Sequence, residues 1–176
     1  MTLTAVIARY NEDVIWKDKF PSSFVVQKGE HLPNEGREPC SYLWYIIENY
    51  DLLEGNYLFT QGNPNETPEI FTHTYTDDFY WFKGREVTYK CDLRGIPQDN
   101  IDIVSFLKEC NLTYTLDYIV FNGCCTFSIN AKDIKKNTKE YYQSIYNAIL
   151  KVPRGEYAFE RLVRHIFYQD QDSLYK

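Results

Sequence analysis

The stretch Thr4-Ala5-Val6-Ile7-Ala8, followed at once by Arg9-Tyr10-Asn11-Glu12-Asp13, indicates the fold class and the place to look for a site. A β-branched apolar run predicts a buried strand. This strand ends in polar side chains, and ligands of open α/β sheets bind just beyond the carboxyl ends of the strands. Arg9, Asn11 and Glu12 are therefore candidate ligand-binding residues. The alternative interpretation is a surface turn that caps a following helix.

Apolar runs and helical spacing alternate along the rest of the chain. We expect strands at Leu3–Ala8, Ser23–Gln27, Asn56–Thr60, Glu86–Cys91, Tyr118–Phe121 and Thr126–Ile129. We expect helices at Glu38–Tyr50, Asp99–Cys110, Lys139–Lys151 and Tyr157–Tyr168, with shorter helical segments at Asp13–Phe20 and after Asn130. This alternation predicts an α/β fold with a mixed, mostly parallel central sheet flanked by helices. Because no linker or repeat divides the sequence, residues 1–176 should form a single domain.

The composition excludes several classes of protein. The net charge of the 176 residues is −6, and no block of Lys and Arg exceeds two consecutive residues, which argues against nucleic-acid binding. No apolar run is long enough to span a membrane, and the N-terminus lacks a signal-peptide pattern. The five cysteines form no C-x-x-C pair, so we expect reduced thiols and a cytoplasmic protein.

Two segments could bind an anion or a sugar. In Asn34-Glu35-Gly36-Arg37-Glu38-Pro39, an arginine stands where a helix begins, and helix N-termini and guanidinium groups both bind phosphate. The alternative is a solvated Arg37 beside two glutamates. In Gln61-Gly62-Asn63-Pro64, amide side chains follow a strand and can both donate and accept hydrogen bonds. The alternative there is an ordinary turn.

The last predicted helix carries two candidate general bases, Glu160 and Glu156. Glu160 lies at the edge of the apolar stripe of this helix, because successive residues are about 100° apart around the axis. A half-buried carboxylate has a raised pKa and can accept a proton from a reacting hydroxyl. The alternative is an i,i+4 ion pair between Glu160 and Arg164, which stabilises a helix only slightly.

Two further motifs are weaker. Asp77-Asp78 could bind a divalent cation, but adjacent carboxylates on an extended strand point to opposite faces. Cys124-Cys125 could include a nucleophile, but we expect a buried structural role for both thiols. The three histidines show no metal-ligand spacing.

Several of these segments together resemble the domain-of-unknown-function family 3431. The resemblance rests on Ala8-Arg9-Tyr10-Asn11-Glu12-Asp13, Asn34-x-Gly36-Arg37-Glu38, Tyr42-Leu43-x-Tyr45-Ile46-Ile47-x-Asn49-Tyr50-Asp51, Phe59-x-Gln61-Gly62-Asn63-Pro64, Gly123-x-x-x-Phe127-Ser128-Ile129 and Glu160-Arg161-Leu162…Ile166-Phe167. It spans nearly the whole chain, and its first half is the more specific. That family is similar to A-type glycosyltransferases, so the resemblance implies a single-domain nucleotide-binding fold of the GT-A type.

The resemblance also implies a reaction and a set of site residues. It implies transfer of a sugar from a nucleoside-diphosphate donor to a glycan or small-molecule acceptor, with Glu160 as base and Glu156 as the second choice. Donor-binding residues would be Arg9, Asn11, Glu12, Arg37, Gln61 and Asn63. The acceptor would lie near Gly123 and Phe127.

The sequence differs from A-type glycosyltransferases at the motif that binds the metal ion in those enzymes. A-type transferases usually carry Asp-x-Asp after a central strand, whereas Asn63 stands here where the family often has an acid. This leaves open whether Mn²⁺ or Mg²⁺ accompanies the nucleotide sugar, and cations such as Arg37 could neutralise the diphosphate instead. Two other functions stay open. One is a non-catalytic module that binds nucleotide sugars or glycans, and the other is a metal-dependent phosphoesterase that uses Asp77 and Asp78.

Overall fold

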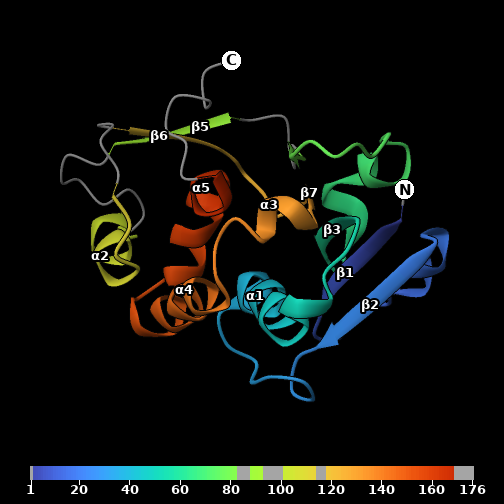
Figure 1. Ribbon diagram of the computed structural model, residues 1–176, viewed down its shortest axis with the longest axis horizontal. Helices are drawn as coiled ribbons and strands as arrows, with labels where there is room; N and C mark the ends of the chain where they lie inside the picture. Colours follow the sequence, from blue (N-terminus) through green and yellow to red (C-terminus); the bar gives the residue numbers. More distant parts are fainter. Residues whose placement is uncertain (1, 83–87, 93–100, 114–117, 169–176) are drawn as a thin grey trace.

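A computed structural model describes residues 2–82, 88–92, 101–113 and 118–168. Its centre is a five-stranded mixed sheet with helices packed against it (Figure 1), which confirms the predicted α/β class. The strand order is β2-β1-β3-β7-β4. These strands are β1 (Leu3–Arg9), β2 (Ser22–Gln27), β3 (Asn56–Gln61), β4 (Tyr80–Trp81) and β7 (Phe127–Asn130).

The prediction of a mostly parallel sheet is wrong. β1 pairs in parallel with both β2 and β3, but β7 runs antiparallel to both of its neighbours, β3 and β4. The chain enters β7 from the edge where β3 ends, since Phe127 pairs with Phe59 and Asn130 with Asn56. The apolar pattern of a buried strand is the same in either direction, so the sequence could not show this reversal.

A separate two-stranded antiparallel sheet joins β5 (Thr88–Asp92) to β6 (Tyr118–Asn122). The predicted strand at Glu86–Cys91 therefore exists over its later part, and residues 86 and 87 lie outside the described residues. β6 packs beside the last helix of the chain (Figure 1). The small sheet thus connects the helical layer to the segment that leads into β7.

The predicted helices are present, with boundaries shifted by a few residues or less. They are α1 (Arg37–Asn49), α2 (Ile103–Glu109), α3 (Ala131–Ile134), α4 (Lys139–Lys151) and α5 (Gly155–Tyr168). Short 3-10 helices are η1 (Ile15–Lys19), η2 (Tyr50–Leu52), η3 (Pro64–Glu66) and η4 (Pro68–Phe71). The side chain of Asn130 accepts a hydrogen bond from the Lys132 amide, as expected of the residue that caps α3. The side chain of Thr138 caps α4 in the same way.

Alternation along β1 gives the sheet two apolar faces. Val6 and Ala8 pack in the larger core, toward the helical layer of α1, α4 and α5, while Ala5 and Ile7 pack in a smaller core on the opposite face. α1 packs against α4 and α5 (Figure 1). The larger core places the start of α1 and the start of α5 beside the same edge of the sheet. In the described residues no helix has the length and apolar character needed to cross a membrane.

Candidate functional site

The carboxyl ends of the three parallel strands meet at one edge of the sheet. Ala8 at the end of β1 lies opposite Gln61 at the end of β3, and Arg9 lies opposite Gln27 of β2. Because β7 is antiparallel, residues 123–126, which precede it, reach the same edge. The edge predicted to bind a ligand therefore also receives a loop from the second half of the chain.

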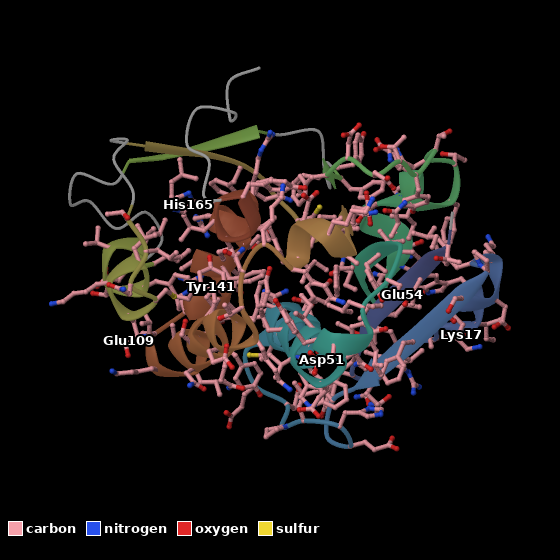
Figure 2. The ribbon with its side chains drawn as sticks, viewed as in Figure 1. Lys17, Asp51, Glu54, Glu109, Tyr141 and His165 are labelled. Atoms are coloured by element: carbon pink, nitrogen blue, oxygen red, sulfur yellow. The ribbon has the colours of Figure 1, made fainter. Side chains whose placement is uncertain are left out.

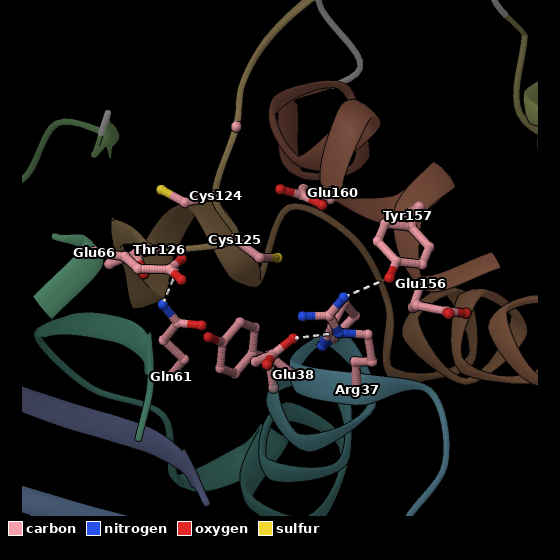
Figure 3. Close-up of a pocket in the computed structure, with 13 residues that line it drawn as sticks. Arg37, Glu38, Gln61, Glu66, Cys124, Cys125, Thr126, Glu156, Tyr157 and Glu160 are labelled. Atoms are coloured by element: carbon pink, nitrogen blue, oxygen red, sulfur yellow. Dashed lines mark hydrogen bonds and ion pairs between the residues drawn. The ribbon is translucent and has the colours of Figure 1, made fainter. Parts of the chain in front are cut away.

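A pocket of about 230 Å³ opens at this edge, between the starts of α1 and α5 (Figure 3). Thirteen residues line it: Arg37, Glu38, Pro39, Tyr42, Gln61, Glu66, Gly123, Cys124, Cys125, Thr126, Glu156, Tyr157 and Glu160. Five predicted site residues are among them, namely Arg37, Gln61, Gly123, Glu156 and Glu160. The fold thus brings together predicted residues that are far apart in the sequence.

Arg37 is held in place at the entrance of this pocket. Its Nη1 donates a 2.6 Å hydrogen bond to the Tyr157 hydroxyl, and its guanidinium lies 5.0 Å from the centre of that ring. Its Nε is 3.4 Å from Glu38 Oε2. Gly36, which precedes the helix, has φ +62°, and a Cβ there would meet Cys40 Sγ at 2.0 Å. Glycine therefore permits the tight turn that presents Arg37 to the pocket.

Glu160 places a half-buried carboxylate in the pocket, in the second turn of α5. Burial raises its pKa, and Glu38 and Glu66 add to this increase, while Arg161 and Arg37 partly offset it. In the described part of the chain this carboxylate has no hydrogen bond or ion pair, so the alternative ion pair with Arg164 is not formed there. A carboxylate with these properties is suited to accept a proton.

Glu156 is placed differently, although it is one turn away on the same helix. Figure 3 shows the Glu160 carboxylate on the side of the cysteine loop, whereas that of Glu156 points away from the other labelled carboxylates. Burial is the main cause that raises the pKa of the Cys40 thiol to about 12; Lys28 lowers this pKa, and Glu156 contributes a smaller increase. Of the two candidate bases, Glu160 therefore has the better position.

Several lining residues were not singled out from the sequence. Glu66 accepts a 3.1 Å hydrogen bond from the Gln61 side chain, and Thr126 lines the same pocket. Tyr42 lies on the pocket wall with no exposed surface, and across the described residues its hydroxyl has no hydrogen-bond partner. Tyr42 belongs to the apolar face of α1, so helical spacing alone indicates a core residue.

The other predicted donor-binding residues lie outside this pocket, in the loops that follow β1 and β3. Arg9 donates to the Glu12 carbonyl at 2.8 Å and to Gln27 Oε1 at 2.7 Å. Glu12 Oε2 accepts hydrogen bonds from the amides of Tyr10 and Asn11 at 2.7 and 3.1 Å. These groups hold their own loop together.

Asn63 also serves its own loop, because its side chain accepts from the Asn65 amide at 3.2 Å and caps η3. Glu12 and Asn63 line a separate, more open hollow. Phe127, predicted to contact the acceptor, is fully buried and packs with Phe59 and Phe167 at ring-centre distances of 5.2 and 5.3 Å. Phe127 therefore belongs to the hydrophobic core next to the pocket and does not line the pocket itself.

The weaker motifs lie elsewhere. Asp77 accepts a 3.0 Å hydrogen bond from the Asn130 side chain, at the opposite edge of the sheet from the pocket. The buried Cys124 donates from Sγ to the Phe82 carbonyl at 2.8 Å. In the described ranges no three His, Cys, Asp or Glu side chains lie close enough together to hold a metal ion. The residues at hand do not by themselves make the divalent-cation site of A-type transferases.

A second hollow lies on the far side of α5, where His165 and Tyr141 face α2 (Figure 2). His165 is buried, its Nε2 lies 3.0 Å from the Thr113 carbonyl oxygen, and burial lowers its pKa. It follows Glu160 by five positions, which corresponds to about 140° around the helix axis. The imidazole therefore cannot share the pocket of Glu160.

The geometry of the pocket has to be interpreted on its own. Comparison with protein-family models, with curated proteins and with solved structures found no match to this chain.

Proposed function

We propose that this protein is a glycosyltransferase that moves a sugar from a nucleoside-diphosphate donor to an acceptor hydroxyl. One observation carries the proposal. The Glu160 carboxylate is half-buried, has no partner in the described residues, and faces a polar pocket at the carboxyl ends of the parallel strands. A carboxylate held in this way has a raised pKa and is suited to act as a general base, which supports the proposal.

In the proposed reaction, Glu160 removes the proton of the acceptor hydroxyl. The oxygen of that hydroxyl forms a bond to the anomeric carbon of the donor sugar, and the bond from this carbon to the diphosphate breaks. The diphosphate leaves with the bonding electrons. Arg37, fixed by Tyr157 and Glu38, is the cation at the pocket entrance that would stabilise the leaving group. Gln61 and the loop at Gly123 line the pocket and would position the acceptor, while the donor would lie at the entrance beside Arg37.

A metal ion bound with the nucleotide would supply further positive charge to the diphosphate. Asn63 stands where the acid of A-type transferases is expected, and the described residues offer no group of acidic ligands near it. We therefore assign no step to a metal.

The second candidate function is a non-catalytic module that binds nucleotide sugars or glycans. It is favoured by the charge of the pocket, where the carboxylates of Glu38, Glu66, Glu156 and Glu160 outnumber the guanidinium of Arg37. An excess of carboxylates suits a sugar better than a diphosphate. The two candidates differ in whether donor is consumed.

The test is the release of nucleoside diphosphate from a panel of UDP- and GDP-linked sugars, with and without Mn²⁺ and with mixed sugar acceptors. The glycosyltransferase releases diphosphate only when donor and acceptor are both present. Sugar binding without release would support the binding module. If neither release of nucleoside diphosphate nor binding of a sugar is detected, both candidate functions are contradicted.

Arg37 provides a second arm of the test. Arg37→Ala should raise the KM for the donor about tenfold, because it removes a cation from the leaving-group side of the pocket. Arg154→Ala is the matched control, since Arg154 also lies over the Tyr157 ring, at 4.6 Å, but does not line the pocket. Equal effects of the two substitutions would contradict the role given to Arg37.

A further inference from the structure

The buried hydroxyl of Tyr42 needs a partner. Tyr42 has no exposed surface and lies on the pocket wall, and no residue in the described part of the chain forms a hydrogen bond with its hydroxyl. Burial raises the pKa of this phenol, and the neighbouring Cys125 and Glu38 raise it further, so it stays a neutral O–H donor. A buried hydroxyl without a partner costs free energy, and such a group calls for a partner or a functional role.

The charge around the pocket indicates what a ligand must bring. The carboxylates of Glu38, Glu66 and Glu160 come from three different elements, and Arg37 is the cation that lines the pocket with them (Figure 3). Glu38 is engaged by Arg37, and one oxygen of Glu66 by Gln61. The lining therefore has more hydrogen-bond acceptors than donors. It suits a ligand that is rich in donors and carries a positive charge.

The positions of these carboxylates favour an amine over a metal ion. A divalent cation needs several oxygen ligands that converge at short distances. The carboxylates here are spread around the wall, and within the described residues no three acidic side chains converge. A protonated amine needs three acceptors at ordinary hydrogen-bond distances, and neutral oxygens suffice for two of them. Glu66, Gln61 and Thr126 line one side of the pocket, and their side chains contain oxygen acceptors of both kinds (Figure 3).

The size of the pocket restricts the ligand further. Its volume of about 230 Å³ is below the range of roughly 300–1,000 Å³ that is typical of pockets for drug-sized molecules. A single sugar ring is the unit that fits. Its hydroxyls would meet Tyr42 and Glu160.

We propose that the pocket binds an amino sugar as the acceptor, with its protonated amine against Glu66 and Gln61 and one ring hydroxyl accepting from Tyr42. This inference rests on the proposed function, because it names the acceptor whose hydroxyl Glu160 deprotonates. It assigns Tyr42 and Glu66 as specificity-determining residues.

The experiment is calorimetric titration of the free protein with glucosamine, N-acetylglucosamine, glucose and glucuronate. Spermidine, a polyamine without a sugar ring, is titrated alongside them. All titrations are done at low salt and at about pH 6, where an ordinary α-amino group, with a pKa near 8, is protonated. Glucosamine should bind about tenfold more tightly than N-acetylglucosamine or glucose, since charged hydrogen bonds are the stronger ones. Glucuronate should not bind. Equal affinity for the amine and its acetylated form would overturn the proposal, as would tighter binding of the polyamine spermidine.

Two variants with matched controls test the residues. Tyr42→Phe should weaken glucosamine binding about tenfold, while the melting temperature stays the same or rises, because a buried hydroxyl without a partner is removed. Tyr45→Phe, in the same helix but outside the pocket, should leave binding unchanged. Glu66→Gln should abolish the preference for the amine, and Glu69→Gln, which does not line the pocket, should keep it.

Unchanged binding in Tyr42→Phe or in Glu66→Gln would overturn the assignment of that residue. These outcomes are distinct from failure of the proposed function. If donor and a different acceptor release nucleoside diphosphate while glucosamine does not bind, the transferase stands and the amino-sugar acceptor is wrong. If glucosamine binds as described but no donor is consumed, the site stands and catalysis is wrong.

Discussion

Two polar regions at the same edge of the sheet differ in how their polar groups are satisfied. In the loop after β1, the Arg9 side chain donates hydrogen bonds to the Glu12 carbonyl and to Gln27. The Glu12 carboxylate accepts hydrogen bonds from two backbone amides of the same loop. In the pocket, the Glu160 carboxylate and the Tyr42 hydroxyl have no partner in the described residues. The first pattern stabilises a loop, and the second leaves polar groups available to a ligand. Substitutions in the two regions should therefore have opposite consequences, since one region should lose stability and the other activity.

The largest expected effect is on turnover. Glu160→Gln keeps the shape of the side chain and removes its basicity, so turnover should fall about 10²–10⁴-fold, the usual contribution of a general base. The melting temperature should not fall, because a half-buried charge is removed. Turnover and unfolding are measured on the same preparation.

Glu156→Gln is the matched control for this comparison. It changes the same residue type one turn away on α5, and it should keep nearly full turnover, because the Glu156 side chain points away from the other labelled carboxylates of the pocket. A collapse of turnover in Glu156→Gln with normal turnover in Glu160→Gln would transfer the role of base to Glu156.

The next effect concerns the support of the pocket. Phe127→Ala should lower the free energy of unfolding by about 3–5 kcal/mol, because it leaves a cavity among fully buried rings. The measurement is urea denaturation followed by circular dichroism. If the variant is as stable as the wild type and loses only acceptor affinity, Phe127 contacts the acceptor and the assignment to the core is wrong.

A smaller effect is expected in the β1 loop. Glu12→Ala removes the acceptor of two backbone amides at an exposed position, which should cost about 1 kcal/mol of unfolding free energy. Donor KM should change little. A large rise in donor KM without loss of stability would show that Glu12 serves the ligand and not its own loop.

The smallest effect is a dependence of stability on pH. The pKa of Glu160 is raised in the folded protein, so the folded state binds a proton more tightly than the unfolded chain. The stabilising contribution of protonated Glu160 is complete below the unfolded pKa and is lost as the pH rises through the folded pKa. Glu160→Gln should flatten the stability profile in this window. In the same variant, the fall of kcat/KM on the acid side of its pH profile should also disappear, because no carboxylate remains to be protonated there.

The sequence predicts most of the local structure. Helical spacing located α4 at Lys139–Lys151 without error, and runs of β-branched, aromatic and other apolar residues located β1, β2 and β3 to within a residue at each end. These elements are determined by the periodicity of their own apolar residues. The direction of β7 was not predictable in this way, because pairing direction depends on how the chain returns to the sheet.

The candidate site was predicted in part for a related reason. Arg37 and Gln61 have polar side chains at the ends of elements, and Glu160 lies at the edge of an apolar helical stripe; both patterns are visible in the sequence. Tyr42 lies on the apolar face of a helix, where its hydroxyl has significance only once α5 and the loop at residues 123–126 are placed over it. Residues of that kind become apparent only in three dimensions.

The reversed strand β7 has a consequence for how relatives of this protein could diverge. β4 and β7 are neighbours in the sheet, yet residues 82–126 separate them in the chain, and this excursion ends in the loop that closes the pocket. Changes at residues 123–126 would reshape the wall of the pocket, because these residues line it, while the pairing of β7 with β3 and β4 begins only at Phe127. The ligand range of the pocket could therefore evolve there without rebuilding the sheet.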